Sequence, residues 1–138
     1  MTSKILLVDD EPDILTFIED SLVMEGYEVR SALSGEEALK KLDNSVDLII
    51  LDVMLPDMNG FKVCEKMRES YACPILFLSA DSSERSRIEG LLIGGDDYIS
   101  KPFSLKELKA RIVANLRRTT DLRMVDQKEF LRYGSILI

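Results

Sequence analysis

Four candidate strands, three of them almost wholly apolar, recur along the chain, and each is followed directly by polar residues. In chain order these are Ile5–Val8 before Asp9 and Asp10, Leu48–Leu51 before Asp52, Ile75–Leu78 before Ser79, and Asp97–Ser100 before Lys101. Continuous apolar runs of this length are typical of strands that are buried on both faces of a parallel sheet. Because the carboxyl ends of parallel strands share one edge, we expect three carboxylates, a hydroxyl and an ammonium group to meet in one crevice.

Segments of helical period separate the apolar runs, which indicates repeated βα units and an α/β fold. The predicted strands are 5–8, 27–33, 47–53, 74–80 and 97–100, and the predicted helices follow Pro12, Ser34 and Gly60, span about 83–93, and run from Ser104 to about Arg118. Right-handed crossovers and the burial of the most apolar strands favour a flavodoxin-like, doubly wound five-stranded parallel sheet of order 2-1-3-4-5. This order places the topological switch point between Asp9-Asp10 and Asp52.

Length and charge restrict the possible functions. The 138 residues correspond to one domain, and the net charge of −7 gives this segment no bulk attraction for nucleic acid. Met1–Lys4 leads straight into a predicted strand, and no apolar stretch approaches the roughly 20 residues of a membrane span, so we expect a cytoplasmic protein. Cys64 and Cys73 lack metal-ligand spacing, and we expect them to be inert packing residues.

Two loops carry residues whose predicted role is structural. Asp57 and Asn59-Gly60 follow the third predicted strand and fit turn and helix-start positions. Gly94 and Gly95 precede the fifth strand, and their backbone freedom predicts a loose loop there.

The loop after the first strand is too acidic to bind a phosphate on its own. Asp9, Asp10, Glu11 and Asp13 would repel a phosphate, so the site requires a cation, and Mg²⁺ is the natural candidate. The sequence has no histidine and no glycine-lysine phosphate loop, but a carboxylate also accepts a phosphoryl group. Asp52 stands alone at the end of a buried strand and is the best placed nucleophile.

Lys101 and Ser79 complete this predicted chemistry. The Lys101 ammonium group would bind one phosphoryl oxygen, and the Ser79 hydroxyl would donate a hydrogen bond to another. Phosphoryl transfer needs little covalent chemistry from a protein, so positioning and charge neutralisation are the main catalytic tasks.

These motifs resemble a response-regulator receiver domain of a two-component system, which has a CheY-like fold. The match covers residues 3–118, and its motifs are Val8-Asp9-Asp10-Glu11, Leu51-Asp52, Pro56-Asp57-Met58-Asn59-Gly60, Ser79-Ala80 and Lys101-Pro102-Phe103. The resemblance implies that Asp52 accepts a phosphoryl group from a phosphohistidine of a sensor histidine kinase. Such a protein is not an enzyme but a phosphoacceptor switch that assists its own phosphorylation and dephosphorylation.

The resemblance also implies roles for the surrounding residues. Asp10, Asp52 and the backbone carbonyl of Met54 would ligate Mg²⁺, and Asp9 would help through a water molecule. Tyr98 corresponds to the switch aromatic, which turns inward when the Ser79 hydroxyl moves to the phosphoryl group. The Lys101-Pro102 peptide bond is usually cis in the family, which would aim the lysine into the pocket.

Within the family, the chain resembles the OmpR/PhoB type of DNA-binding regulator. Receivers of this type dimerise through their fourth helix, fifth strand and fifth helix when phosphorylated. The matching positions here are the charge pairs Arg87 with Glu107, Asp97 with Arg111 and Asp96 with Arg118, around an apolar patch of Ile88, Leu91 and Ala110. Exposed ion pairs contribute only about 0–1 kcal/mol each, so we expect them to set the register of the dimer more than its affinity.

The C-terminal residues suggest a second domain. We interpret residues 1–118 as the receiver, 119–128 as a linker, and 129–138 as the first strand of a truncated winged-helix effector domain. An apolar strand that stops without a partner would be an aggregation liability, so we expect the chain to be a piece of a longer protein. Control of transcription would then depend on a DNA-binding domain that this chain lacks.

Three other functions remain open. A stand-alone receiver that acts through protein contacts would differ from a DNA-binding regulator only in the residues beyond Ile138. A pure interaction module would have the same pocket but would accept no phosphate. A magnesium-dependent phosphohydrolase of the haloacid dehalogenase type needs a second acid two residues after the nucleophile, where this chain has Met54.

Overall fold

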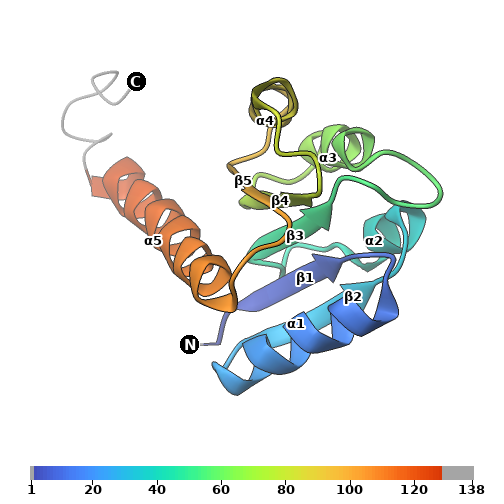
Figure 1. The fold of residues 1–138 in the computed structure, drawn as a ribbon. Coiled ribbons are helices and arrows are strands. Elements are labelled where there is room, and N and C mark those ends of the chain that lie inside the picture. The colour runs from blue at the N-terminus through green and yellow to red at the C-terminus, as the bar shows by residue number, and fades with distance from the viewer. Residues whose placement is uncertain (1, 129–138) are drawn as a thin grey trace.

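The computed structural model describes residues 2–128 and contains one five-stranded sheet, in which the strand order is β2-β1-β3-β4-β5 and every neighbouring pair is parallel (Figure 1). The strands are β1 (Lys4–Val8), β2 (Glu28–Ala32), β3 (Leu48–Asp52), β4 (Ile75–Ser79) and β5 (Asp97–Ser100). The helices are α1 (Pro12–Met24), α2 (Gly35–Lys41), α3 (Gly60–Arg68), α4 (Glu84–Leu92) and α5 (Leu105–Lys128). The predicted fold class, strand order and alternation of strands with helices are therefore confirmed.

Helices cover both faces of the sheet, which explains why the central strands are apolar throughout. Side chains of α1 and α5 pack on one face, and side chains of α2 and α3 pack on the other. Every residue of β3 and β4 is buried. Burying a leucine or isoleucine side chain stabilises the fold by about 1.5–3 kcal/mol, so these two strands anchor the core beneath the carboxyl edge of the sheet.

Residues with cap and turn preferences mark the boundaries of several helices. Pro12 begins α1, where its missing N–H costs nothing. The Ser34 hydroxyl accepts a hydrogen bond from the backbone N–H of Glu37 at 3.1 Å and thereby caps α2. The Asn59 side chain accepts one from the N–H of Phe61 at 2.7 Å, which confirms its predicted helix-start role.

The C-terminal helix is longer than the sequence predicted. The structure continues α5 to Lys128, whereas the hydrophobic periodicity predicted an end near Arg118. Residues 119–128 carry few apolar side chains, so periodicity gave no reason to extend the helix. The role of this stretch as an interdomain linker stays a prediction, and the predicted strand at 129–138 lies outside the described residues. None of the helices within residues 2–128 has the length and apolar character needed to cross a membrane.

The two glycines in the loop between α4 and β5 pack closely against neighbouring side chains, which their sequence did not predict. Gly94 has a φ of +123°, which glycine adopts without strain. A Cβ atom on Gly95 would lie 2.3 Å from a ring carbon of Phe77. The glycines therefore allow close packing in this loop, and its predicted looseness stays a prediction.

Candidate functional site

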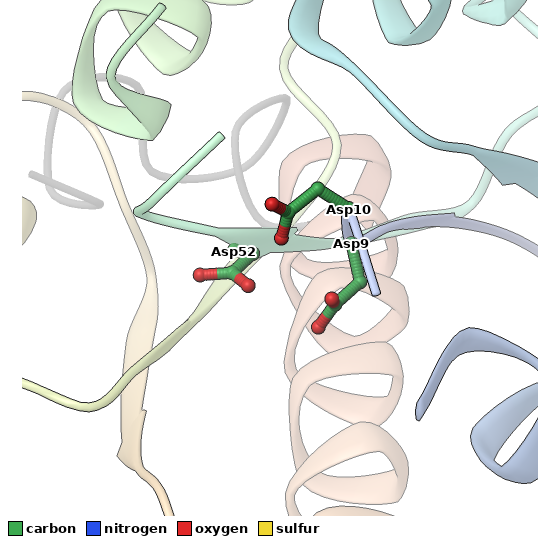
Figure 2. A group of neighbouring side chains, drawn as sticks. All are labelled: Asp9, Asp10 and Asp52. Atoms are coloured by element: carbon green, nitrogen blue, oxygen red, sulfur yellow. The ribbon is translucent and has the colours of Figure 1, made fainter. Parts of the chain in front are cut away.

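Three carboxylates gather where β1 and β3 end, as the edge argument predicted. Asp9 and Asp10 follow β1, and Asp52 is the last residue of β3 (Figure 2). One carboxylate oxygen from each lies within 4.8 Å of the others. Asp9 and Asp52 are buried, whereas Asp10 is exposed, so the cluster opens to solvent on the side of Asp10.

Lys101 follows β5 and links two of these carboxylates. Its Nζ lies 2.9 Å from Oδ2 of Asp52 and 3.2 Å from Oδ2 of Asp9. Burial lowers the pKa of the Lys101 ammonium group, but the hydrogen bond and charge of Asp52, together with Asp9, outweigh burial and raise it. Lys101 is therefore positively charged and acts as the internal counter-ion of the acidic cluster. The peptide bond between Lys101 and Pro102 is cis, as the resemblance implied.

The Asp52 carboxylate is buried, with 3% of the residue exposed, and both of its oxygens accept hydrogen bonds. Oδ1 accepts one from the backbone N–H of Met54 at 3.0 Å, and Oδ2 accepts one from Lys101. Burial raises the pKa of Asp52, while the bonds from Lys101 and Met54 oppose the rise without cancelling it. These two donors favour the ionised form, which a nucleophilic carboxylate requires.

The donor set fits a small divalent cation. Mg²⁺ prefers oxygen ligands and is usually bound through one or two carboxylates with several water molecules retained. Asp10 and Asp52 offer such oxygens, and Asp10 is exposed to solvent. Two backbone contacts hold together the ends of the loop that carries the Met54 carbonyl. Met54 forms an isolated bridge with Asn59, and the N–H of Gly60 donates to the carbonyl of Val53 at 2.7 Å. The Met54 side chain points outward and is 67% exposed.

Ser79 and Tyr98 are connected through the backbone of Asp81. The buried Ser79 hydroxyl accepts a hydrogen bond from the N–H of Asp81 at 3.0 Å. The Tyr98 hydroxyl donates to the carbonyl of Asp81 at 2.6 Å and lies 2.8 Å from the hydroxyl of Ser86 in α4. Tyr98 is only 5% exposed, so its ring occupies the inward position that the resemblance associates with the phosphorylated state.

The structure also brings together most residues of the predicted dimer surface. A groove of about 440 Å³ is lined by Arg87 and Leu91 of α4, Asp96 and Asp97 at β5, and Glu107 and Arg111 of α5. Within the chain, Arg111 lies 2.6 Å from Asp97 and 3.1 Å from Glu107, and the Arg87 guanidinium carbon lies 5.9 Å from the centre of the Tyr98 ring.

The remaining predicted dimer residues, Ile88, Ala110 and Arg118, are exposed. The contacts expected between two copies of the chain stay a prediction.

Several supporting residues were missed or only partly understood from the sequence. The carboxylate of Asp57 accepts hydrogen bonds from the N–H groups of Gly35 and Glu36 at 2.9 and 2.8 Å and so ties its loop to the start of α2. These bonds lower the pKa of Asp57. Ser86 and Arg68 were not singled out, because serine and arginine are ordinary on helix surfaces and nothing in the local sequence marks their partners.

The family model for the response regulator receiver domain matches residues 5–113. The chain is 50% identical over 140 residues to the uncharacterized transcriptional regulatory protein YrkP of Bacillus subtilis, a match that covers 100% of this chain and 61% of YrkP. It is 46% identical over 117 residues to the transcriptional regulatory protein CpxR of Escherichia coli, covering 85% of this chain and 50% of CpxR. The chain therefore spans only about half the length of such relatives.

Solved structures agree with these sequence matches. A two-component response regulator from Clostridium difficile superimposes with a TM-score of 0.82 at 35% identity, covering 86% of this chain and 98% of that one. The response regulator DrrB, an OmpR/PhoB homolog from Thermotoga maritima, matches with a TM-score of 0.79 at 33% identity, covering 86% of this chain and 54% of DrrB. The resemblance to OmpR/PhoB-type regulators is thereby supported, and the chain belongs to the response regulator receiver domain family.

Proposed function

We propose that the chain accepts a phosphoryl group on Asp52 from a phosphohistidine of a sensor histidine kinase. A carboxylate oxygen of Asp52 attacks the phosphorus in line, a P–O bond forms, and the P–N bond to the histidine breaks. The observation that supports this proposal most strongly is the position of Asp52, which is buried at the carboxyl edge of the sheet with Lys101 at 2.9 Å and the carboxylates of Asp9 and Asp10 beside it.

The surrounding residues position the phosphoryl group and compensate its charge. The ammonium group of Lys101 lies within hydrogen-bond distance of Oδ2 of Asp52. When that carboxylate carries the phosphoryl group, Lys101 moves from Oδ2 to a phosphoryl oxygen. The Ser79 hydroxyl donates to another phosphoryl oxygen. Asp10, Asp52 and the Met54 carbonyl would hold Mg²⁺, and Asp9 would support it through water. When bound, the ion neutralises charge on the phosphoryl oxygens.

The proposed output is dimerisation through α4, β5 and α5. Phosphorylation adds roughly −1.5 to −2 charges at Asp52 and new hydrogen-bond acceptors. The link from Ser79 through the Asp81 backbone to Tyr98 and Ser86 joins the site to α4. Dimerisation then uses the Arg87–Glu107, Asp97–Arg111 and Asp96–Arg118 pairs and the apolar residues between them.

We further propose that the whole protein is a cytoplasmic regulator of transcription, which binds DNA through a domain absent from this chain. The names of its relatives, which are transcriptional regulatory proteins, support this proposal. So does their length, since the matches cover only 61% of YrkP and 50% of CpxR.

Intact-protein mass spectrometry after incubation with acetyl phosphate and Mg²⁺ tests the chemistry. We expect a gain of one phosphoryl group in the wild type and in Asp20→Asn, an exposed control in α1. Asp52→Asn and an EDTA sample should show no gain. Phosphorylation that persists in Asp52→Asn would refute Asp52 as the acceptor, and no gain in the folded wild type would favour a pure interaction module.

A further inference from the structure

Arg68, the last residue of α3, joins three segments at the edge of the sheet opposite the acidic cluster. Its Nε donates to the carbonyl of Gly94 at 2.9 Å, and its Nη1 donates to the carbonyls of Cys73 and Tyr71 at 2.7 and 3.2 Å. Its Nη2 lies 2.8 Å from Oδ2 of Asp96. One guanidinium group therefore fixes the loop before β4, the loop before β5 and the carboxylate that directly precedes β5.

The packing around this guanidinium group is specific for arginine and glycine. A Cβ atom on Gly94 would lie 2.9 Å from Cγ of Arg68, so only a glycine leaves room for the side chain. The Arg68 side chain is 22% exposed and uses donors on Nε and on both terminal nitrogens. A lysine carries three donors on one atom and cannot reach these separated acceptors at once.

Asp96 is held from two sides. Its Oδ2 accepts hydrogen bonds from Arg68 and from the backbone N–H of Ile75 at 2.9 Å, and its own N–H donates to the Ile75 carbonyl at 2.8 Å. The carboxylate is still 40% exposed. A carboxylate has two oxygens with about four acceptor sites, so commitment of Oδ2 within the chain leaves capacity for a donor from outside.

We propose that Arg68 is a positioning residue for the dimer surface, which fixes Asp96 in the orientation that Arg118 of a second copy recognises. This inference rests on the proposed dimerisation. Holding a side chain in one conformation before binding removes an ordering cost from association. Arg68 also places a positive charge near Asp96, which weakens the attraction for Arg118, but charge effects at an exposed surface are small. The ordering effect is therefore the larger one, and loss of Arg68 weakens the dimer.

A double-mutant cycle on the full chain tests the proposal. Each variant is phosphorylated with acetyl phosphate and Mg²⁺, the phosphorylated fraction is measured by mass spectrometry, and the dimer dissociation constant is measured by sedimentation equilibrium. We expect Arg68→Gln to weaken the dimer by about 3- to 10-fold. The control Lys66→Gln, which removes the same charge from an exposed side chain of α3, should change the constant less than about twofold.

The cycle separates positioning from a general effect on the fold. In an Arg118→Gln background, Arg68→Gln should cause no further loss, because the orientation of Asp96 no longer matters there. The proposal would be overturned if the dissociation constant of the double variant rose by the product of the two single fold-changes. An unchanged dissociation constant in Arg68→Gln would also overturn it. If Arg68→Gln does not fold, Arg68→Lys serves in the same cycle, since it keeps the charge and loses the planar fork. A phosphorylated wild type that stays monomeric would refute the proposed dimerisation and the role of Arg68 in it.

Discussion

Replacement of Lys101 by alanine removes the cation that two buried carboxylates share. The distances of 2.9 and 3.2 Å to Asp52 and Asp9 correspond to gross attractions of about 5–6 kcal/mol each at an effective dielectric constant of 20. Much of this is offset by the cost of desolvating the ammonium group, and removal of one partner from a buried charge pair typically costs about 3–5 kcal/mol. Because the cluster opens to solvent beside Asp10, we expect the lower end, about 3 kcal/mol.

Urea unfolding followed by circular dichroism measures this loss. In EDTA, a destabilisation of about 3 kcal/mol lowers the midpoint by about 2 M if the urea m value is about 1.5 kcal/mol per M. Excess Mg²⁺ should stabilise Lys101→Ala more than the wild type. In the variant, the repulsion between Asp9 and Asp52 is no longer balanced by Lys101, and a cation that binds only the folded state would compensate it.

Lys106→Ala, which changes an exposed lysine of α5, is the matched control and should shift the unfolding free energy by less than about 0.5 kcal/mol. The reasoning fails if Lys101→Ala loses less than about 1 kcal/mol in EDTA. It fails equally if Mg²⁺ stabilises the variant no more than the wild type.

Three further predictions concern the surroundings of the site. Gly60→Ala should lose about 1–3 kcal/mol in thermal unfolding, because its Cβ would lie 2.3 Å from the carbonyl oxygen of Asp52, and an unchanged melting temperature would contradict this. Burial raises the pKa of Cys64 to about 11 and also raises that of Cys73, so iodoacetamide should label the native protein slowly near neutral pH and rapidly in urea; fast native labelling would show accessible thiolates. Asp57→Ala should weaken Mg²⁺ binding in calorimetry, because the loop that carries the proposed carbonyl ligand loses its anchor. Since the pKa of Asp57 is lowered, its stabilising effect is present above the ordinary value of 3.8 and is lost on acidification, so the variant should lose less stability in acid than the wild type.

The sheet and the acidic cluster were predictable because they depend on strong, simple patterns. Runs such as Leu48–Leu51 are apolar at every position, which is compatible with a strand covered on both faces. Once such strands are parallel, residues that follow them share an edge whatever their separation in sequence. Lys101 and Asp9, 92 positions apart, meet for this reason.

The supporting contacts were not predictable, because most of their partners are backbone groups. Arg68 binds three carbonyl oxygens, and every residue offers one, so the sequence around its partners carries no signal. From the sequence, Gly94 and Gly95 predict a flexible backbone. In the structure, the absence of a side chain at these positions makes room for Arg68 and Phe77. A glycine provides both backbone freedom and a small volume, and only the neighbouring atoms show which of the two properties the fold requires.

We expect the backbone of Asp81 to couple the proposed chemistry to the dimer surface. Its N–H donates to the Ser79 hydroxyl at 3.0 Å and its carbonyl accepts from Tyr98 at 2.6 Å, so movement of the serine toward Asp52 breaks the first bond and leaves the second. A neutral hydrogen bond of this kind contributes about 0.5–1.5 kcal/mol, and a bond to a charged phosphoryl oxygen is roughly twice as strong. We therefore expect this exchange of hydrogen bonds to favour the switched state by about 1 kcal/mol, which corresponds to an about fivefold larger population. We expect the contact of Lys101 with the phosphoryl group to add to this bias.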